Sequence, residues 1–343
     1  MAGQPLLSVR HLSTDFIGAD GKIAHALEDV SFDVHPGETL GLVGESGCGK
    51  TTTMMSLMRL LPSSGRITRG QVLFDGRDLL NLSEVEMRDY RWKEMAMVFQ
   101  SAMNALNPVY TIGQQIREAI LQHGLMGREN ANKRVEELLD LVGIAKSRKE
   151  QYPHQYSGGM RQRAMIAMAL ACKPRLLFAD EPTTALDVMV QAQVLELLKK
   201  IQTEFGLAVV LVTHDLGVVA EVCDSVVVMY GGKVAEYGPI DQVYNAPQHP
   251  YTQRLLEAFP DLNQPGDTLA SIPGSPPRLN ALPPGCRFEP RCHKRIDVCS
   301  TLSPRLIAVT SAPDSSFILH PSSFAKRHLA ACHLCQGQEV QYS

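Results

Sequence analysis

The stretch Gly44-Glu45-Ser46-Gly47-Cys48-Gly49-Lys50-Thr51 has the pattern of a phosphate-binding loop, with glycines ahead of a lysine and a threonine. The apolar segment Thr39–Val43 before it is typical of a buried strand, and Lys50–Leu61 after it is typical of a helix that Pro62 ends. In that setting the loop N–H groups and the helix N-terminus face an anion. The stretch therefore predicts a strand, a loop and a helix that bind a nucleotide.

Each residue type in the loop suits one task. Glycine allows the backbone to approach the phosphates, because a Cβ atom would hold it away. The Lys50 ammonium group can reach the terminal phosphates, and the Thr51 hydroxyl suits a Mg²⁺ ligand. The alternative, a glycine loop without a ligand, does not explain Lys50-Thr51 after the last glycine. We assign the phosphate contacts to Gly44, Glu45, Ser46, Gly47, Cys48, Gly49, Lys50, Thr51 and Thr52.

Two carboxylates follow a second apolar strand, Leu176–Ala179. Asp180 ends this strand, so its carboxylate emerges at the edge of the sheet, where it can hold Mg²⁺. Glu181 comes next, and we expect it to act as the general base or to orient the attacking water. A solvent-facing acidic pair at a strand end is the alternative interpretation.

Three other residues lie at predicted strand ends. His214 follows the strand Leu207–Thr213 and could contact the γ-phosphate, although a histidine in this position is more often a cap or a core residue. Gln100 ends the strand Met95–Phe99 and could ligate the metal. Phe16 could stack on an adenine ring, although by default it is a core residue.

A second glycine motif, Ser157-Gly158-Gly159, begins an apolar helix predicted over Arg161–Cys172. Its helix N-terminus is another anion site. An N-cap role alone would explain Ser157, but two glycines in the first turn favour close approach of a phosphate. This clamp has no obvious task in its own chain, so the sequence indicates half of a paired ATPase.

The chain has 343 residues, 44% of them hydrophobic and 20% charged, and a net charge of −3. This composition is that of a packed globular protein and gives no sign of a nucleic-acid surface. The N-terminus lacks the pattern of a signal peptide, and the apolar stretches are too short to span a bilayer. We therefore expect a cytoplasmic chain that meets a membrane only through partners.

The chain divides into regions of different pattern. Alternation in Leu7–Val34 predicts antiparallel strands, and Val135, Leu138, Leu139 and Val142 recur at helical spacing. We expect residues 1–260 to form the main domain, with a helical insertion at about 101–170. Residues 261–343 would form a proline-rich C-terminal appendix.

That appendix carries most of the cysteines. Cys286, Cys292, Cys299 and Cys332 could supply four thiolates to a [4Fe–4S] cluster or to tetrahedral zinc, and unligated thiols are the third possibility. The role of a metal there would be structural, because the segment has little core of its own.

Taken together, the motifs resemble those of the nucleotide-binding subunit of an ATP-binding cassette transporter. The correspondence runs from Walker A at Gly44–Thr51 through the Q-loop Gln100, the signature Ser157–Met160, Walker B at Leu176–Asp180 with Glu181 and the D-loop Ala185-Leu186-Asp187 to the switch His214. The resemblance covers about residues 6–260. It implies an α/β P-loop NTPase cassette with a mixed sheet core, an antiparallel β part and a helical insertion.

Further stretches resemble the dipeptide/oligopeptide importer subfamily, notably Phe99–Pro108, Tyr152–Arg163, His249-Pro250-Tyr251 and Gly285–Cys292. Tyr156 and Met160 replace the more common Leu and Gln of the signature. Members with this cysteine pattern resemble iron–sulfur subunits, which favours the cluster over zinc.

The resemblance implies a dimer, more often with a second ATP-binding subunit than with a copy of the chain, that sandwiches two MgATP molecules. Each phosphate loop, with Asp187 nearby, would be closed by the partner's signature motif. Two transmembrane permease subunits would contact the segment from Gln100 to Tyr110, and an extracellular or periplasmic binding protein would deliver the cargo. The chain would lie peripherally on the cytoplasmic face of the inner or plasma membrane.

Peptides are the cargo that the subfamily favours, and oligosaccharides or nickel complexes are alternatives for the same machine. A soluble cassette ATPase of DNA maintenance would need basic surfaces and large insertions, which this negatively charged chain lacks. A free-standing iron–sulfur electron carrier would leave the nucleotide motifs unexplained.

Overall fold

The computed structural model of the chain describes residues 4–100, 105–184, 186–258, 272–309 and 327–335. The chain folds into two compact units. Unit 1 comprises Met1–His35, Leu40–Leu80 and Thr213–Ser343, and unit 2 comprises Pro36–Thr39 and Asn81–Val212. The phosphate loop therefore belongs to unit 1, whereas Asp180 and Glu181 belong to unit 2.

Unit 1 contains the antiparallel sheet that the alternation predicted, with the strand order β2-β1-β4-β5. The strands are β1 (Leu7–Ile17), β2 (Ile23–Val34), β4 (Gly65–Phe74) and β5 (Arg77–Asp78). β1 pairs with β2 on one side and with β4 on the other. Its first residues, Leu7–Arg10, are therefore buried.

A second set of strands in unit 1 has the order β11-β12-β10-β9-β3. These strands are β3 (Thr39–Val43), β9 (Ser225–Tyr230), β10 (Lys233–Pro239), β11 (Ile307–Ala308) and β12 (Leu329–Ala330). β3 and β9 are parallel, and β9 and β10 form the predicted hairpin around Gly231-Gly232. Both glycines have positive φ angles, as a tight turn between such strands requires.

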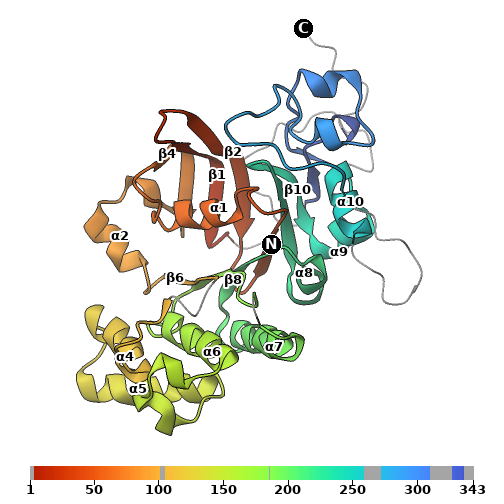
Figure 1. The fold of residues 1–343 in the computed structure, drawn as a ribbon. Helices are drawn as coiled ribbons and strands as arrows, with labels where there is room; N and C mark the ends of the chain where they lie inside the picture. Colours follow the sequence, from red (N-terminus) through yellow and green to blue (C-terminus); the bar gives the residue numbers. More distant parts are fainter. Residues whose placement is uncertain (1–3, 101–104, 185, 259–271, 310–326, 336–343) are drawn as a thin grey trace. The chain divides into compact units, whose positions relative to one another are not determined.

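Short helices complete unit 1 (Figure 1). They are the α-helices α1 (Lys50–Leu57), α8 (Leu216–Val222), α9 (Ile240–Asn245) and α10 (Pro250–Glu257), and the 3₁₀ helices η4 (Glu289–Arg291), η5 (Asp297–Ser300) and η6 (His333–Cys335). The 3₁₀ helix η1 (Leu79–Asn81) lies at the boundary with unit 2.

Unit 2 contains a parallel sheet of β6 (Met95–Val98), β7 (Leu176–Asp180) and β8 (Ala208–Thr213), with β7 between the other two. All five residues of β7 are buried, as its apolar sequence predicted. The helices are α2 (Glu84–Tyr90), α4 (Ile112–Gln122), α5 (Arg128–Leu141), α6 (Gly158–Ala169) and α7 (Val188–Phe205), with the 3₁₀ helices η2 (Lys146–Glu150) and η3 (Pro153–Gln155).

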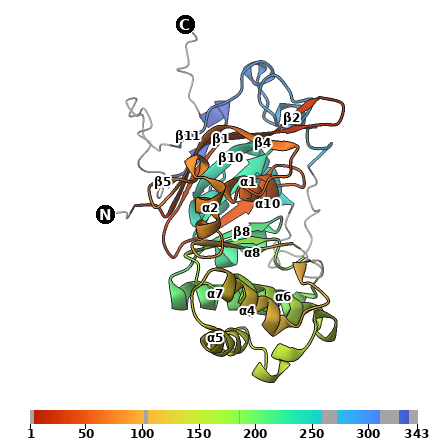
Figure 2. The same cartoon turned by 90° about the vertical axis from the view of Figure 1, so that its left-hand side faces the viewer.

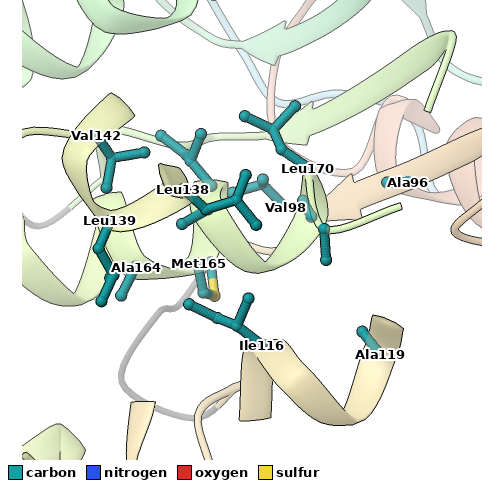
Figure 3. Close-up of a cluster of buried hydrophobic side chains, with 14 of the residues drawn as sticks. Ala96, Val98, Ile116, Ala119, Leu138, Leu139, Val142, Ala164, Met165 and Leu170 are labelled. Atoms are coloured by element: carbon teal, nitrogen blue, oxygen red, sulfur yellow. The ribbon is translucent and has the colours of Figure 1, made fainter. Parts of the chain in front are cut away.

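The core of unit 2 joins its helices to β6 (Figure 3). The predicted stripe of α5 packs inward, and Leu138 and Leu139 are fully buried. Ile116 and Ala119 of α4 and Met165 of α6 belong to the same cluster. Because each buried leucine contributes about 1.5–3 kcal/mol, this cluster accounts for the packing of α4, α5 and α6 against one another in Figure 2.

The structure corrects two sequence predictions and leaves a third unconfirmed. The helix expected to reach Leu61 ends at Leu57, because Arg59 takes a left-handed φ of 51° well before Pro62. The helix expected from Arg161 begins at Gly158. A separate cysteine-bearing appendix is not confirmed: the C-terminal residues belong to unit 1, where β12 pairs with β10. The domain boundary predicted near residue 260 lies outside the described residues.

Among the described residues, no helix combines the length and the apolar character that crossing a membrane requires.

Candidate nucleotide site

Three glycines of the phosphate loop have backbone conformations that other residues avoid. The φ angles are 146° at Gly44, 78° at Gly47 and 108° at Gly49. A Cβ atom on Gly44 would come within 2.2 Å of the Met229 carbonyl oxygen, and one on Gly49 would lie 2.8 Å from Leu27 Cδ2. The glycines at 44 and 49 are therefore required by the fold of the loop itself, in addition to the approach of phosphate predicted from the sequence.

Lys50 is buried and its ammonium group closes the loop. Its Nζ atom donates hydrogen bonds to the carbonyl oxygens of Gly44, at 2.6 Å, and Glu45, at 3.1 Å. α1 begins at Lys50, and its N-cap residue Gly49 provides no side-chain cap. A helix N-terminus without a side-chain cap is compatible with an anion, and the phosphate contact expected there stays a prediction.

The other loop residues differ in exposure. Ser46, Gly47 and Thr51 are exposed, and the assignment of the Thr51 hydroxyl as a Mg²⁺ ligand stays a prediction. Cys48 is buried, and burial raises the pKa of its thiol although the charge of Lys50 acts in the opposite direction. We therefore assign Cys48 a packing role in the loop rather than a reactive one.

In unit 2, β7 places Asp180 and Glu181 at its carboxyl end. Asp180 is 4% exposed, whereas Glu181 has a left-handed φ of 42°, a conformation that a non-glycine residue adopts only when its surroundings hold it there. The Glu181 N–H donates to the Val212 carbonyl at 2.9 Å. The turn after β7 is therefore fixed by the neighbouring strand β8.

The Glu181 carboxylate is held by two side chains. Gln100 Nε2 donates to its Oε2 atom at 2.7 Å, and Thr184 Oγ1 donates to the same atom at 2.9 Å. The structure thus brings together two residues that the sequence predicted separately, Gln100 and Glu181. Thr184 was missed, because a threonine three residues after the carboxylate carries no distinctive sequence signal.

The signature motif has both an N-cap and a packing role. Ser157 Oγ accepts the Met160 N–H at 3.3 Å and caps α6. A Cβ on Gly159 would lie 2.5 Å from Val190 Cγ1 of α7, whereas a Cβ on Gly158 would meet only Leu186 Cδ2 at 3.6 Å. Packing against α7 therefore explains Gly159, whereas a Cβ on Gly158 would make only an ordinary van der Waals contact, so packing does not explain that glycine.

The remaining predicted residues lie as follows. His214 is exposed and directly follows β8, and Phe16 is half-buried at the end of β1 with its ring against Gly65. Asp187 caps α7, because its carboxylate accepts the Val190 N–H at 3.0 Å. Of the predicted D-loop, Ala185 lies outside the described residues.

The four cysteines predicted to bind a metal interact electrostatically. The pKa of Cys286 is raised to about 11, mainly by burial and in smaller part by charges on Cys299, Cys332 and Cys292. A hydrogen bond from Cys335 lowers the pKa of Cys332. Within the described ranges, however, no group of three or more His, Cys, Asp or Glu side chains is arranged so that it could hold a metal ion. The predicted iron–sulfur or zinc site is therefore not confirmed.

Together, the fold, the phosphate loop, the carboxylates after β7 and the signature motif define a P-loop ATPase of the cassette type. Comparison with known proteins agrees: residues 27–184 match the family described as ABC transporter, and residues 235–299 match the family described as oligopeptide/dipeptide transporter, C-terminal region.

Two curated relatives cover most of the chain. It is 51% identical over 304 residues to the dipeptide transport ATP-binding protein DppD of Bacillus subtilis (strain 168), covering 88% of this chain and 90% of that protein. It is 48% identical over 301 residues to the oligopeptide transport ATP-binding protein OppD of Escherichia coli (strain K12), covering 87% and 89%.

Among solved structures, a dimer of the ATP-binding cassette MJ0796 in a post-hydrolysis state bound to ADP and Pi is similar, with a TM-score of 0.61 and 29% identity. The match covers 68% of this chain and 98% of that one. The chain belongs to the ATP-hydrolysing subunits of ABC transporters, in the branch that carries the oligopeptide/dipeptide transporter C-terminal region.

Proposed function

We propose that this chain is the ATP-hydrolysing subunit of an importer for dipeptides or oligopeptides. The observation that carries the proposal is the identity of about one half to dipeptide and oligopeptide transport ATP-binding proteins over most of the chain, which includes the C-terminal region. The composition favours a transporter subunit over a DNA-maintenance ATPase, because a net charge of −3 is not typical of a protein that binds DNA.

In the proposed mechanism, the phosphate loop binds the β- and γ-phosphates of ATP through its N–H groups and Lys50. Thr51, Gln100 and Asp180 would hold Mg²⁺, which neutralises charge that develops on the phosphates. Glu181 orients the attacking water and accepts its proton, and the left-handed turn at this residue supports a fixed position for the carboxylate. His214 would contact the γ-phosphate, and Phe16 would stack on adenine.

A second ATP-binding subunit, rather than a second copy of this chain, is the proposed partner. Its signature motif would close the phosphate loop of this chain, and Ser157-Gly158-Gly159 of this chain would close the partner's loop. The dimeric form of the similar cassette MJ0796 supports this arrangement. Dimer closure would drive two transmembrane permease subunits, so the chain would lie peripherally on the cytoplasmic face of the membrane.

Reconstitution in vesicles tests the cargo assignment. The chain would be purified with its second ATP-binding subunit and both permease subunits, and the cognate binding protein would be added with or without a tripeptide. We expect the peptide-loaded binding protein to stimulate ATP hydrolysis and to deliver labelled peptide into the vesicles. Stimulation by an oligosaccharide or a nickel complex, without any response to peptides, would contradict the peptide assignment but leave the ATPase role intact.

We propose separately that Cys286, Cys292, Cys299 and Cys332 ligate a [4Fe–4S] cluster. Zinc bound by the same four thiolates is the alternative. The Cys286 N–H donates to the Cys299 carbonyl at 2.8 Å, which supports the proximity of these two residues. Protein purified anaerobically should contain iron and inorganic sulfide in equal amounts and absorb in the visible range. Protein that contains zinc without iron or sulfide would support the zinc site. Protein that contains no iron, sulfide or zinc would contradict a metal site at these cysteines.

A further inference from the structure

The carboxylate of Glu45, the second residue of the phosphate loop, forms an ion pair with an arginine from the C-terminal region. Arg291 Nη1 donates to Glu45 Oε2 at 2.6 Å, and Arg291 Nη2 donates to Oε1 at 3.0 Å. The Arg291 side chain is 5% exposed and that of Glu45 is 26% exposed. This bidentate geometry is the strongest form of an arginine–carboxylate contact, and burial of Arg291 limits screening by solvent.

Arg291 is itself held in orientation by its surroundings. Its Nε atom donates to the Pro273 carbonyl at 2.8 Å, and Nη2 also donates to the Ile272 carbonyl at 3.3 Å. Nη1 donates to the Tyr230 hydroxyl at 3.2 Å. Burial would lower the pKa of Arg291, but the bonds to Glu45 and Tyr230 raise it. The guanidinium group is therefore a fixed positive charge behind the phosphate loop.

A second contact fixes the backbone of the same loop residue. The Glu45 N–H donates to the Tyr251 hydroxyl at 2.9 Å. Tyr251 of α10 is fully buried, and its ring centroid lies 4.6 Å from that of Tyr230 and 5.4 Å from that of Phe288. Glu45 is thus held through its backbone by Tyr251 and through its side chain by Arg291, and both residues follow His214, the last predicted residue of the nucleotide site, in the sequence.

This arrangement has an electrostatic consequence for nucleotide binding. The phosphate loop must accept a triphosphate, and a free carboxylate within the loop would repel it. Arg291 neutralises that carboxylate and restrains the loop before the nucleotide arrives, which lowers the ordering cost of binding. We propose that Arg291 is a positioning residue for ATP, so that the C-terminal region contributes directly to nucleotide affinity.

A single and a double variant should differ in MgATP affinity in an unusual order. Arg291→Gln removes the cation but leaves the Glu45 charge in the loop, so we expect MgATP to bind about tenfold more weakly. In the Glu45→Gln, Arg291→Gln double variant the repulsive charge is gone, and affinity should return to within about threefold of the unmodified chain. In Arg291→Gln the kcat at saturating ATP should change little, because the Arg291 contact acts on nucleotide binding.

Equilibrium titration of the full-length chain with a fluorescent ATP analogue and Mg²⁺ measures these affinities, with thermal unfolding recorded for each variant. Arg295→Gln is the matched control, because this arginine lies four residues away, is 65% exposed and forms its ion pair with Glu289 at 3.4 Å. A double variant that binds as weakly as Arg291→Gln, or an Arg291→Gln variant with unchanged affinity, would overturn the proposal. A purely structural role for Arg291 predicts the first of these results.

Discussion

Replacement of Glu181 by glutamine should lower kcat for ATP hydrolysis by about 10²–10⁴-fold while MgATP affinity stays within about threefold of the unmodified chain. Glutamine has nearly the same shape and can still accept the hydrogen bonds that Gln100 and Thr184 donate to Oε2. It cannot accept a proton from the attacking water. Binding and turnover should therefore separate in this variant.

Steady-state hydrolysis and nucleotide titration on the assembled ATPase pair measure the two quantities. Glu196→Gln, an exposed glutamate on α7, is the matched control and should leave both unchanged. If Glu181→Gln hydrolysed ATP at near-normal rate, Glu181 would not be the general base, and the assignment of the reaction to the end of β7 would be wrong.

Replacement of Lys50 by alanine should weaken MgATP binding by about a hundredfold, because this buried cation is proposed to contact the phosphates through charge-assisted hydrogen bonds. The structure adds a second cause. The carbonyl oxygens of Gly44 and Glu45 lose the donor that holds the loop together. We therefore expect a lower melting temperature as well as weaker binding.

Nucleotide titration and thermal unfolding together check this prediction. Lys22→Ala is the control for charge, because Lys22 is 71% exposed and forms its ion pair with the nearby Asp20. A folded Lys50→Ala protein with unchanged MgATP affinity would show that the ammonium group does not reach the nucleotide.

The parts of the fold that depend on local pattern could be predicted from the sequence. β7 follows from its apolar run, the stripe of α5 from helical spacing, and the phosphate loop from its glycines and Lys50. These signals lie within a few residues of one another, so periodicity and motif suffice to find them.

The support around the site could not be predicted, because it comes from distant residues. Tyr251 and Arg291 lie 206 and 246 positions from Glu45, and each is a single residue without a periodic pattern. The sequence predicted that Gly159 contacts a phosphate. The structure shows a second reason for glycine at this position, because a side chain would collide with Val190 of another helix. The left-handed turn at Arg59, which shortens α1, likewise has no clear local signal.

We propose that two ATP-binding subunits close on MgATP, each completing the nucleotide site of the other. The most direct test of this proposal is light scattering with nucleotide quantification on the Glu181→Gln chain mixed with its second ATP-binding subunit and saturating MgATP. We predict a stable dimer that retains two ATP molecules after gel filtration and that separates when Ser157 is replaced by a large residue. Subunits that stay apart and release all nucleotide under these conditions would contradict the account.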